Sequence, residues 1–366
     1  MKLKNIVLTG IMFLAAGGFC GCSSDDDDVD DNKEPVIESP KGATMQVMVV
    51  FAPGQLGDKG YADRVMDGIH LIESNQPEAD SCKVDVHFIS LSDPIFTRRS
   101  MEQWIHTATN GFTGTDYKRR LLVLTESYMI DWLAKGEGKD LRENDEVLVL
   151  KAIGDDADNS NLQLGSRLHT LNIAATVSAR KFSSFMDARI AREIERGYED
   201  RFNPNLLTML RLYSKEEVEY RDSLYETLIE LRGDDLEVNE DMALSDLDNA
   251  GIYSSLLNEE VIQGAYDCGM MLENYVKSDG NIFTIVDLGA ANLGFDYCLI
   301  RQSGFSYSTL MLDARPNKLN RFVIDRRFDL ALNNWVSQWA SRDVAQMPKA
   351  ISYSDENYCQ DNITVE

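Results

Sequence analysis

Positive charge is scarce in this sequence of 366 residues. Its 36 Lys and Arg residues stand against 61 Asp and Glu residues, which gives a formal net charge of −25. The phosphate backbone of DNA or RNA repels such a chain, and no basic stripe offsets the acidic excess. We therefore expect no nucleic-acid partner. Apolar residues make up 43% of the chain, so a buried core is still expected.

Metal-binding and catalytic motifs are missing as well. The histidines, and the cysteines that follow residue 22, show no CxxC, CxxH or HExxH spacing, so we expect no zinc site. Gly289 and Gly294 have P-loop glycine spacing, but Phe295 and Asp296 replace the Lys and Ser/Thr that would hold phosphate and magnesium. No GxSxG elbow is present. We therefore expect no catalytic residues, no metal and no cofactor, and we do not predict an enzyme.

The one long apolar run lies at the N-terminus. Lys2 and Lys4 precede the apolar segment 6–16, which is too short to span a bilayer and is typical of a secretory signal. Gly21 precedes Cys22, as a small residue precedes the acylated cysteine in bacterial lipoprotein signals. We therefore predict a lipoprotein signal peptide over residues 1–21 and a membrane-anchoring lipid on Cys22.

An acidic segment follows the predicted anchor. Residues 23–31 read SSDDDDVDD, and a run of like charge is solvated and extended. Pro35 and Pro40 disfavour helix, so we predict a flexible tether over residues 22–43. Serine followed by acids also resembles the signal that sends some Gram-negative lipoproteins to the cell surface. This resemblance implies a lipid-anchored protein of the outer membrane.

The cysteines of the main body leave disulfide pairing open. An exported protein can form disulfides, but spacing alone does not reveal which residues pair. Buried thiols are the default expectation for Cys82, Cys268, Cys298 and Cys359.

Short apolar runs alternate with longer helical patterns through the rest of the chain. This alternation favours parallel sheets with helices on both faces, joined by right-handed crossovers. The expected strands are 45–51, 83–90, 120–125, 146–153, 170–177, 206–213, 282–288, 308–313 and 321–325. One expected helix begins at Tyr61. Five further helices are expected over 99–109, 182–201, 215–231, 259–276 and 328–340.

We therefore predict an α/β fold of two doubly wound parallel-sheet lobes that are interleaved in sequence. Residues 44–180 form mainly the first lobe, and residues 181–340 form mainly the second, with a crossover back to the first. The pattern weakens after Ala340, so residues 341–366 are expected to form an irregular extension. Ligands of such folds bind at the carboxyl ends of the strands, which makes the strand-end loops the candidate site.

Two strand-end loops carry suitable polar residues. The loop after the first strand contains two inner glycines that permit a tight turn, and its Asp58 and Tyr61 are expected to point toward a cleft between the lobes. Glu126 and Ser127 follow another expected strand. Ser127 is equally typical of a helix N-cap.

The loop after the first strand resembles that of the basic membrane lipoprotein family, the purine-nucleoside receptors built on the type I periplasmic-binding fold. The family pattern there is Asp-Lys-Ser-Phe-Asn. Asp58 and Lys59 match it, and Tyr61 stands for the Phe that stacks on the base. Gly60 replaces the Ser of the pattern, and Ala62 replaces the Asn that makes the base-reading contact in the family. The resemblance implies stacking by Tyr61 and hydroxyl recognition by Asp58.

The resemblance continues in the second half of the chain. Residues 283–294 are similar to the family's apolar strand, glycine-rich turn and helix start, with Gly289 and Asn292 in the turn, where helix amides can meet polar ligand groups. Asp313 ends a strand where the family has a ligand-binding Asp, and a carboxylate can accept two ribose hydroxyls. Arg327 stands where the family places a ligand-contacting Lys.

These patterns together predict non-catalytic binding of a small polar ligand, with a nucleoside implied by the resemblance. The protein would serve uptake or sensing, with a membrane transporter as a candidate partner. The predicted ligand-binding residues are Asp58, Tyr61, Glu126, Ser127, Gly289, Asn292, Asp313 and Arg327. The alternative is a glycan-binding or adhesin-type surface lipoprotein that uses exposed aromatic residues, for which the candidates are Trp104, Trp132, Trp335 and Trp339. Of these, Trp335 and Trp339 have the helical spacing of packed residues.

Overall fold

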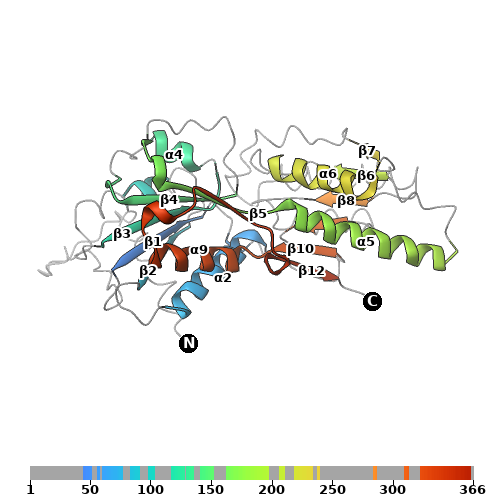
Figure 1. Ribbon diagram of the computed structural model, residues 1–366, viewed down its shortest axis with the longest axis horizontal. Coiled ribbons are helices and arrows are strands. Elements are labelled where there is room, and N and C mark those ends of the chain that lie inside the picture. Colours follow the sequence, from blue (N-terminus) through green and yellow to red (C-terminus); the bar gives the residue numbers. More distant parts are fainter. Residues whose placement is uncertain are drawn as a thin grey trace, which may run out of the picture.

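The computed structural model of this chain describes fifteen separate stretches of the sequence. They are residues 44–51, 56–57, 60–76, 83–90, 98–103, 117–127, 129–135, 141–151, 162–197, 206–210, 218–233, 237–239, 283–286, 309–312 and 322–363. Within them the chain forms two α/β lobes that lie side by side (Figure 1).

The first lobe is built on a six-stranded parallel sheet. Its strand order is β11-β5-β4-β3-β1-β2. The strands are β1 (Met45–Val50), β2 (Val84–Ile89), β3 (Arg119–Leu124), β4 (Asp145–Leu150), β5 (Leu168–Ile173) and β11 (Ala350–Tyr353). One face packs against α2 (Tyr61–Ser74) and α9 (Phe328–Ser341), and the other against α4 (Met129–Lys135) and the helical residues 98–103.

The second lobe repeats this arrangement. Its sheet has the order β12-β10-β9-β8-β6-β7, parallel except for β12. The strands are β6 (Leu206–Leu210), β7 (Glu237–Asn239), β8 (Phe283–Val286), β9 (Thr309–Leu312), β10 (Phe322–Arg326) and β12 (Cys359–Ile363). Helices α5 (Ala175–Glu195) and α6 (Val218–Arg232) pack together beside it. Short 3₁₀ turns lie at η4 (Gly165–Arg167), η10 (Val344–Gln346) and η11 (Glu356–Tyr358).

The central strands of the first lobe account for the apolar runs in the sequence. Every residue of β1 and β4 is buried, because helices cover both faces of the sheet. The predicted fold of two doubly wound parallel-sheet lobes is confirmed. Each of the nine expected strands is present, with ends shifted by no more than a few residues. The expected helix over 259–276 lies outside the described residues.

Two expectations from the sequence differ from the structure. The strand expected over 170–177 ends at Ile173, and α5 begins at Ala175 because Ala175, Ala179 and Phe182 recur at helical spacing and pack in the second lobe. Residues 341–366 do not form an irregular extension, since they contain β11 and β12. Both are edge strands, and β11 buries none of its residues, so neither carries the apolar signal of a central strand.

The chain passes between the lobes three times among the described residues. The passages lie between β5 and α5, between β10 and α9, and between β11 and β12. The Ala174 amide donates to the Tyr353 carbonyl over 2.9 Å, and the Arg327 amide donates to the Tyr358 carbonyl over 2.8 Å. The three passages are therefore hydrogen-bonded to one another, at the junction of the two lobes in Figure 1.

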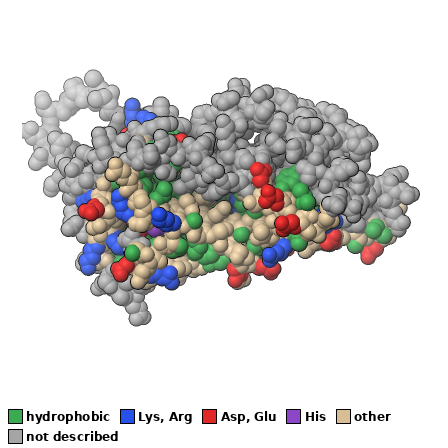
Figure 2. Space-filling view, turned by 45° about the horizontal axis from the view of Figure 1, so that its top comes forward, with side chains coloured by type: hydrophobic (Ala, Val, Ile, Leu, Met, Phe, Trp, Pro, Cys, Tyr) green, Lys and Arg blue, Asp and Glu red, His purple; other side chains and the backbone are tan. Residues whose placement is uncertain are grey.

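Positive and negative side chains lie over different lobes on one face of the molecule. On the face that Figure 2 shows, Lys and Arg side chains gather over the first lobe, whereas Asp and Glu side chains dominate over the second. None of the helices in the described stretches combines the length and apolarity needed to cross a membrane.

A buried polar network ties α9 to the amino-terminal edge of the first sheet. Glu146 Oε1 accepts hydrogen bonds from Arg119 Nη2 over 2.7 Å and from Trp339 Nε1 over 2.8 Å. Its Oε2 lies 3.1 Å from His169 Nε2, and His169 Nδ1 lies 2.9 Å from the Pro348 carbonyl oxygen. Burial disfavours the charge of Glu146, but the hydrogen bonds from His169 and Arg119 outweigh it and lower the pKa of this carboxyl.

Gly68 sets the distance between α2 and α9. A Cβ atom at this position would lie 3.1 Å from both the Cα and the carbonyl oxygen of Asp329, which are backbone atoms that cannot rotate away. We expect Gly68→Val to destabilise the fold by about 1–3 kcal/mol through overpacking. Thermal and urea unfolding would measure the change. Glu73→Val, on the exposed side of the same helix, is the control and is expected to cost less than about 0.7 kcal/mol. Equal losses in both variants would contradict the close packing.

The buried carboxylate of Glu146 makes a distinct pH prediction. Its folded-state pKa is lowered, so its stabilising contribution is complete above the unfolded value of about 4.3 and is lost as the pH falls through the folded value. We expect Glu146→Gln to reduce the free energy of unfolding by about 3 kcal/mol at pH 7. The difference from the wild type should shrink in urea titrations near pH 3. A difference that stays constant with pH would contradict this assignment.

Candidate functional site

The carboxyl edge of the first sheet is the candidate ligand site. In this sheet β2 lies on one side of β1, and β3 lies on the other side. The direction in which successive strands are added therefore reverses between β1 and β3. Ligands of open α/β sheets bind beside such a reversal. Tyr61 at the start of α2, residues 125–127 after β3 and Lys151 after β4 all lie at this edge.

A buried ion pair lies at this edge. Lys151 Nζ is 3.2 Å from Glu126 Oε1 and 3.4 Å from Oε2, and the two side chains are only 2% and 1% exposed. The backbone of Lys151 has φ of 71°, a left-handed conformation that is unfavourable for a side-chain-bearing residue. Its amide donates to the Leu171 carbonyl over 2.8 Å, which fixes this turn to β5.

Tyr61 joins the ion pair to the crossover. Its hydroxyl donates to the Thr125 carbonyl over 2.7 Å, and Lys151 Nζ lies 4.0 Å from the centre of its ring. The ring also meets Phe328 edge-on, with a centroid distance of 4.9 Å. Tyr61 is 0% exposed, so in this conformation it packs against the protein. Its stacking on a ligand stays a prediction.

Ser127 has an unusual environment. The Met129 amide donates to the Glu126 carbonyl and the Ile130 amide to the Ser127 carbonyl, so this segment turns directly into α4. The Ser127 side chain is buried, yet its hydroxyl has no hydrogen-bond partner among the described residues. It is therefore not acting as a side-chain N-cap, and it is a polar group that a ligand could satisfy.

Arg327 lies in the crossover between β10 and α9. Its Nε donates to Asp329 Oδ1 over 2.8 Å, its Nη2 to Asp329 Oδ2 over 2.6 Å and its Nη1 to Gln360 Oε1 over 3.0 Å. The hydrogen bonds to Asp329 raise the pKa of this guanidinium above its ordinary value. The structure thus pairs Arg327 within the protein, and its contact with a ligand stays a prediction.

The structure brings together only part of the predicted set. Tyr61 and Glu126 meet through Lys151 and Thr125, Ser127 follows directly, and Arg327 precedes the Phe328 ring that touches Tyr61. Four predicted ligand-binding residues lie outside the described residues, as does the predicted lipid anchor. These are Asp58, Gly289, Asn292, Asp313 and Cys22.

Lys151 is the residue that sequence reasoning missed. A lysine directly after a run of buried strand residues is a signal that could have found it, because the next position lies at the ligand-binding edge. Charge-balanced pairs are suited to holding a polar ligand by hydrogen bonds. None of the described His, Cys, Asp and Glu side chains belongs to a group of three that could hold a metal ion.

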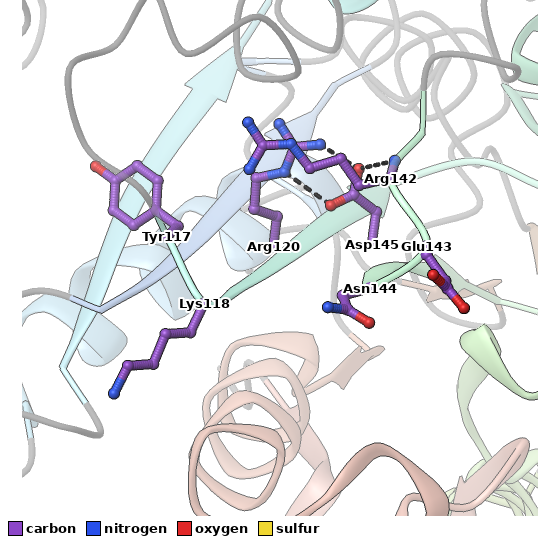
Figure 3. A pocket seen from close by; sticks show the side chains of 7 residues that line it. All are labelled: Tyr117, Lys118, Arg120, Arg142, Glu143, Asn144 and Asp145. Atoms are coloured by element: carbon purple, nitrogen blue, oxygen red, sulfur yellow. Dashed lines mark hydrogen bonds and ion pairs between the residues drawn. The ribbon is translucent and has the colours of Figure 1, made fainter.

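A cavity of about 360 Å³ opens at the opposite, amino-terminal edge of the same sheet (Figure 3). At its floor Arg120 Nε donates to Asp145 Oδ1 over 2.7 Å, and a second bond joins Arg120 Nη2 to Asp145 Oδ2. The Arg142 amide also donates to Asp145 Oδ2 over 2.7 Å. Both oxygens of this carboxylate are therefore used within the protein, and the cavity has the character of a structural ion pair beneath surface loops.

Comparisons with known proteins match the fold and no family. No protein-family model and no curated protein sequence matches the chain. Among solved structures, ABC-transporter solute-binding proteins from Aeropyrum pernix K1 align with a TM-score of 0.52 and 12% identity, over 87% of this chain and 76% of that one.

Two further structures align to a similar degree. A carbohydrate transporter solute-binding protein from Agrobacterium radiobacter, in complex with D-arabinose, has a TM-score of 0.50 and 10% identity over 89% of this chain and 96% of its own. LsrB from Clostridium saccharobutylicum, in complex with AI-2, has a TM-score of 0.50 and 11% identity over 82% of each chain. The chain therefore has a fold of the type I periplasmic-binding-protein kind.

The buried ion pair makes a prediction about stability. Lys151→Met leaves the Glu126 carboxylate buried without its cation, so we expect a loss of about 3–5 kcal/mol in the free energy of unfolding. Adding Glu126→Gln should recover part of that loss, because the uncompensated charge is then removed. Urea unfolding of the single and double variants measures the coupling.

Lys118→Met is the matched control for this pair. Lys118 is an exposed lysine of the same lobe with no ion-pair partner in the described residues, so its replacement should change stability by less than about 0.5 kcal/mol. Additive losses from Lys151→Met and Glu126→Gln would show that the two groups do not stabilise each other.

Proposed function

We propose that this protein is a non-catalytic binding protein for a small polar solute. The observation that carries the proposal is the fully buried polar set at the carboxyl edge of the first sheet, beside the passages between the two lobes. A Lys–Glu pair of zero net charge, a buried hydroxyl without a partner in the described part and a tyrosine at a helix start suit a neutral, hydroxylated ligand.

The comparisons support a solute of this class. Two structures of similar fold are described as solute-binding proteins of transporters, one of them in complex with D-arabinose, and LsrB is in complex with AI-2. The resemblance to the basic membrane lipoprotein family adds a nucleoside as the more specific candidate. Sugars and nucleosides share hydroxyl groups that carboxylate, serine and arginine side chains can bind.

The predicted ligand contacts form part of the proposal. Asp58 and Asp313 accept hydrogen bonds from ligand hydroxyls, and Tyr61 stacks on a ring once the lobes rearrange. Arg327 is the basic contact, Ser127 supplies its hydroxyl, and Glu126 is held for the ligand by Lys151. Gly289 and Asn292 are proposed as further ligand contacts, as the family resemblance implies.

The proposed setting is the cell surface. A lipid on Cys22 and the acidic tether over residues 22–43 would hold the binding lobes outside the outer membrane, where they serve uptake or sensing with a transporter. The glycan-platform alternative is not supported by Trp335 and Trp339, which are 1% and 0% exposed within the core under α9. Its other two tryptophans leave it open, because Trp132 on α4 is partly exposed and Trp104 lies outside the described residues.

A thermal-shift screen tests the proposal. We expect the chain from Thr44 onward to melt at a higher temperature with one class among nucleosides, free bases, monosaccharides, oligosaccharides and amino acids, because a ligand of the native state stabilises it by mass action. Titration calorimetry on the hit would then give the affinity. The absence of any hit, together with retention on immobilised polysaccharide, would contradict the solute-binding proposal.

Two serine variants locate the site. Ser127→Ala removes a buried hydroxyl without a partner in the described part, so it should leave stability within about 0.5 kcal/mol of the wild type and weaken ligand binding about ten-fold. Ser178→Ala is the matched control, because the Ser178 hydroxyl lies 2.6 Å from that of Tyr220 in the second lobe. It should cost about 1 kcal/mol of stability and leave the affinity unchanged. The opposite pattern would place the ligand elsewhere.

A further inference from the structure

Three consecutive charged residues end β10 where the chain passes from the second lobe to the first. Asp325 and Arg326 are 2% and 0% exposed, and Arg327 is partly buried. Three charges in one buried crossover are costly unless each is paired. In the structure these three residues contact different helices: Asp325 contacts α2, Arg326 contacts α6 and Arg327 contacts α9. Together they therefore hold the crossover in place relative to both lobes.

Asp325 reaches across to the first lobe. Arg64 Nε, on α2, donates to Asp325 Oδ1 over 3.0 Å, and Arg64 Nη2 bonds to Asp325 Oδ2, so the pair is bidentate. Burial disfavours the charge of Arg64, but the hydrogen bond and charge of Asp325 outweigh it and raise the pKa of this guanidinium. A bidentate pair fixes orientation as well as distance, which a single contact does not.

The helix that carries Arg64 packs closely against α9. Gly68 lies against the backbone of Asp329, and α2 and α9 share the core that covers the first sheet. Asp325 belongs instead to the sheet of the second lobe, paired with Gln360 of β12. The Arg64–Asp325 pair therefore spans the boundary between the lobes, close in sequence to the covalent crossover at residues 326–328.

The neighbouring residues hold the crossover from the other side. The Arg326 guanidinium carbon lies 4.3 Å from the ring centre of Tyr220 on α6 and 5.6 Å from that of Phe328. Arg327 binds both Asp329 of α9 and Gln360 of β12. Arg326 and Arg327 fix the crossover itself, and among the described residues the Arg64–Asp325 pair joins α2 to the second lobe.

We propose that the Arg64–Asp325 pair is a latch that holds the two lobes in the orientation of this structure. Breaking it frees α2, with Tyr61 at its start, to move relative to β10, and so changes how readily a ligand reaches the carboxyl edge of the first sheet. The effect on ligand access rests on the proposed function, whereas the latch between the lobes requires no ligand. Arg64 and Tyr61 are one turn apart on α2, so the pair connects the crossover to the carboxyl edge of the first sheet.

Amide hydrogen exchange and small-angle X-ray scattering of the ligand-free protein test the latch. Asp325→Asn removes the charge and retains the shape of the side chain. We expect amides of residues 61–67 and 326–331 to exchange at least about three-fold faster, with β4 and α5 unchanged, because only the contact between the lobes is weakened. The scattering should indicate a broader distribution of lobe separations. Arg64→Lys, which keeps the charge and loses the fork, should give a smaller effect of the same kind.

Asp361→Asn is the matched control. Asp361 accepts a bond from Lys181 Nζ over 2.6 Å, and both residues belong to the second lobe, so this ion pair does not cross the boundary. It should leave exchange at residues 61–67 and the scattering unchanged. Wild-type exchange and scattering in both Asp325→Asn and Arg64→Lys would overturn the latch, as would equal acceleration in all segments, which indicates general destabilisation. Because no solute is used, a failed solute screen would not affect this result.

Discussion

The packing of α9 against α2 and the first sheet is the constraint on which the two-lobed arrangement depends. Trp335 and Trp339 fill the core beneath this helix, so the first lobe is incomplete until the chain has built the second lobe and returned. Parallel strands cannot be joined by tight hairpins, and long crossovers are therefore unavoidable. The return places Phe328 against Tyr61, and this contact joins the crossover to the ligand edge.

Buried charge is concentrated where the structure has to be specific. The Lys151–Glu126 pair lies at the carboxyl edge, the Glu146 network at the amino edge and the Arg64–Asp325 pair at the boundary between the lobes. Ion pairs in low-dielectric surroundings add little net stability over apolar packing, but they are costly to break. They are therefore better suited to fixing a particular geometry than to strengthening the core.

The candidate site and the crossover are mechanically connected. Tyr61 begins the helix that carries Arg64 one turn later, and Tyr61 is also the ring on which Lys151 lies. A change in lobe orientation that moves α2 would therefore also shift Tyr61 relative to the Lys151–Glu126 ion pair. Ligand binding that favours one orientation is a shift between existing states, and its size is limited by the difference in affinity for them.

The sequence by itself determined the class of fold and the approximate positions of the nine expected strands. Apolar runs such as those of β1 and β4 are long enough to identify strands covered on both faces, and the predicted order of elements matches the two sheets. It could not reveal β11 and β12, because edge strands take their hydrogen bonds from a neighbour distant in sequence and need little apolar surface.

The tertiary structure alone decided which charged residues meet. Arg64 and Asp325 are 261 positions apart, and Glu126 and Lys151 are 25 apart, so no local spacing relates them. Tyr61 could be chosen from its place after the first strand, but its burial beneath Lys151 depends on the turn after β4. Local pattern is set by backbone periodicity and burial, whereas pairing of charges depends on how the sheets bring distant strand ends together.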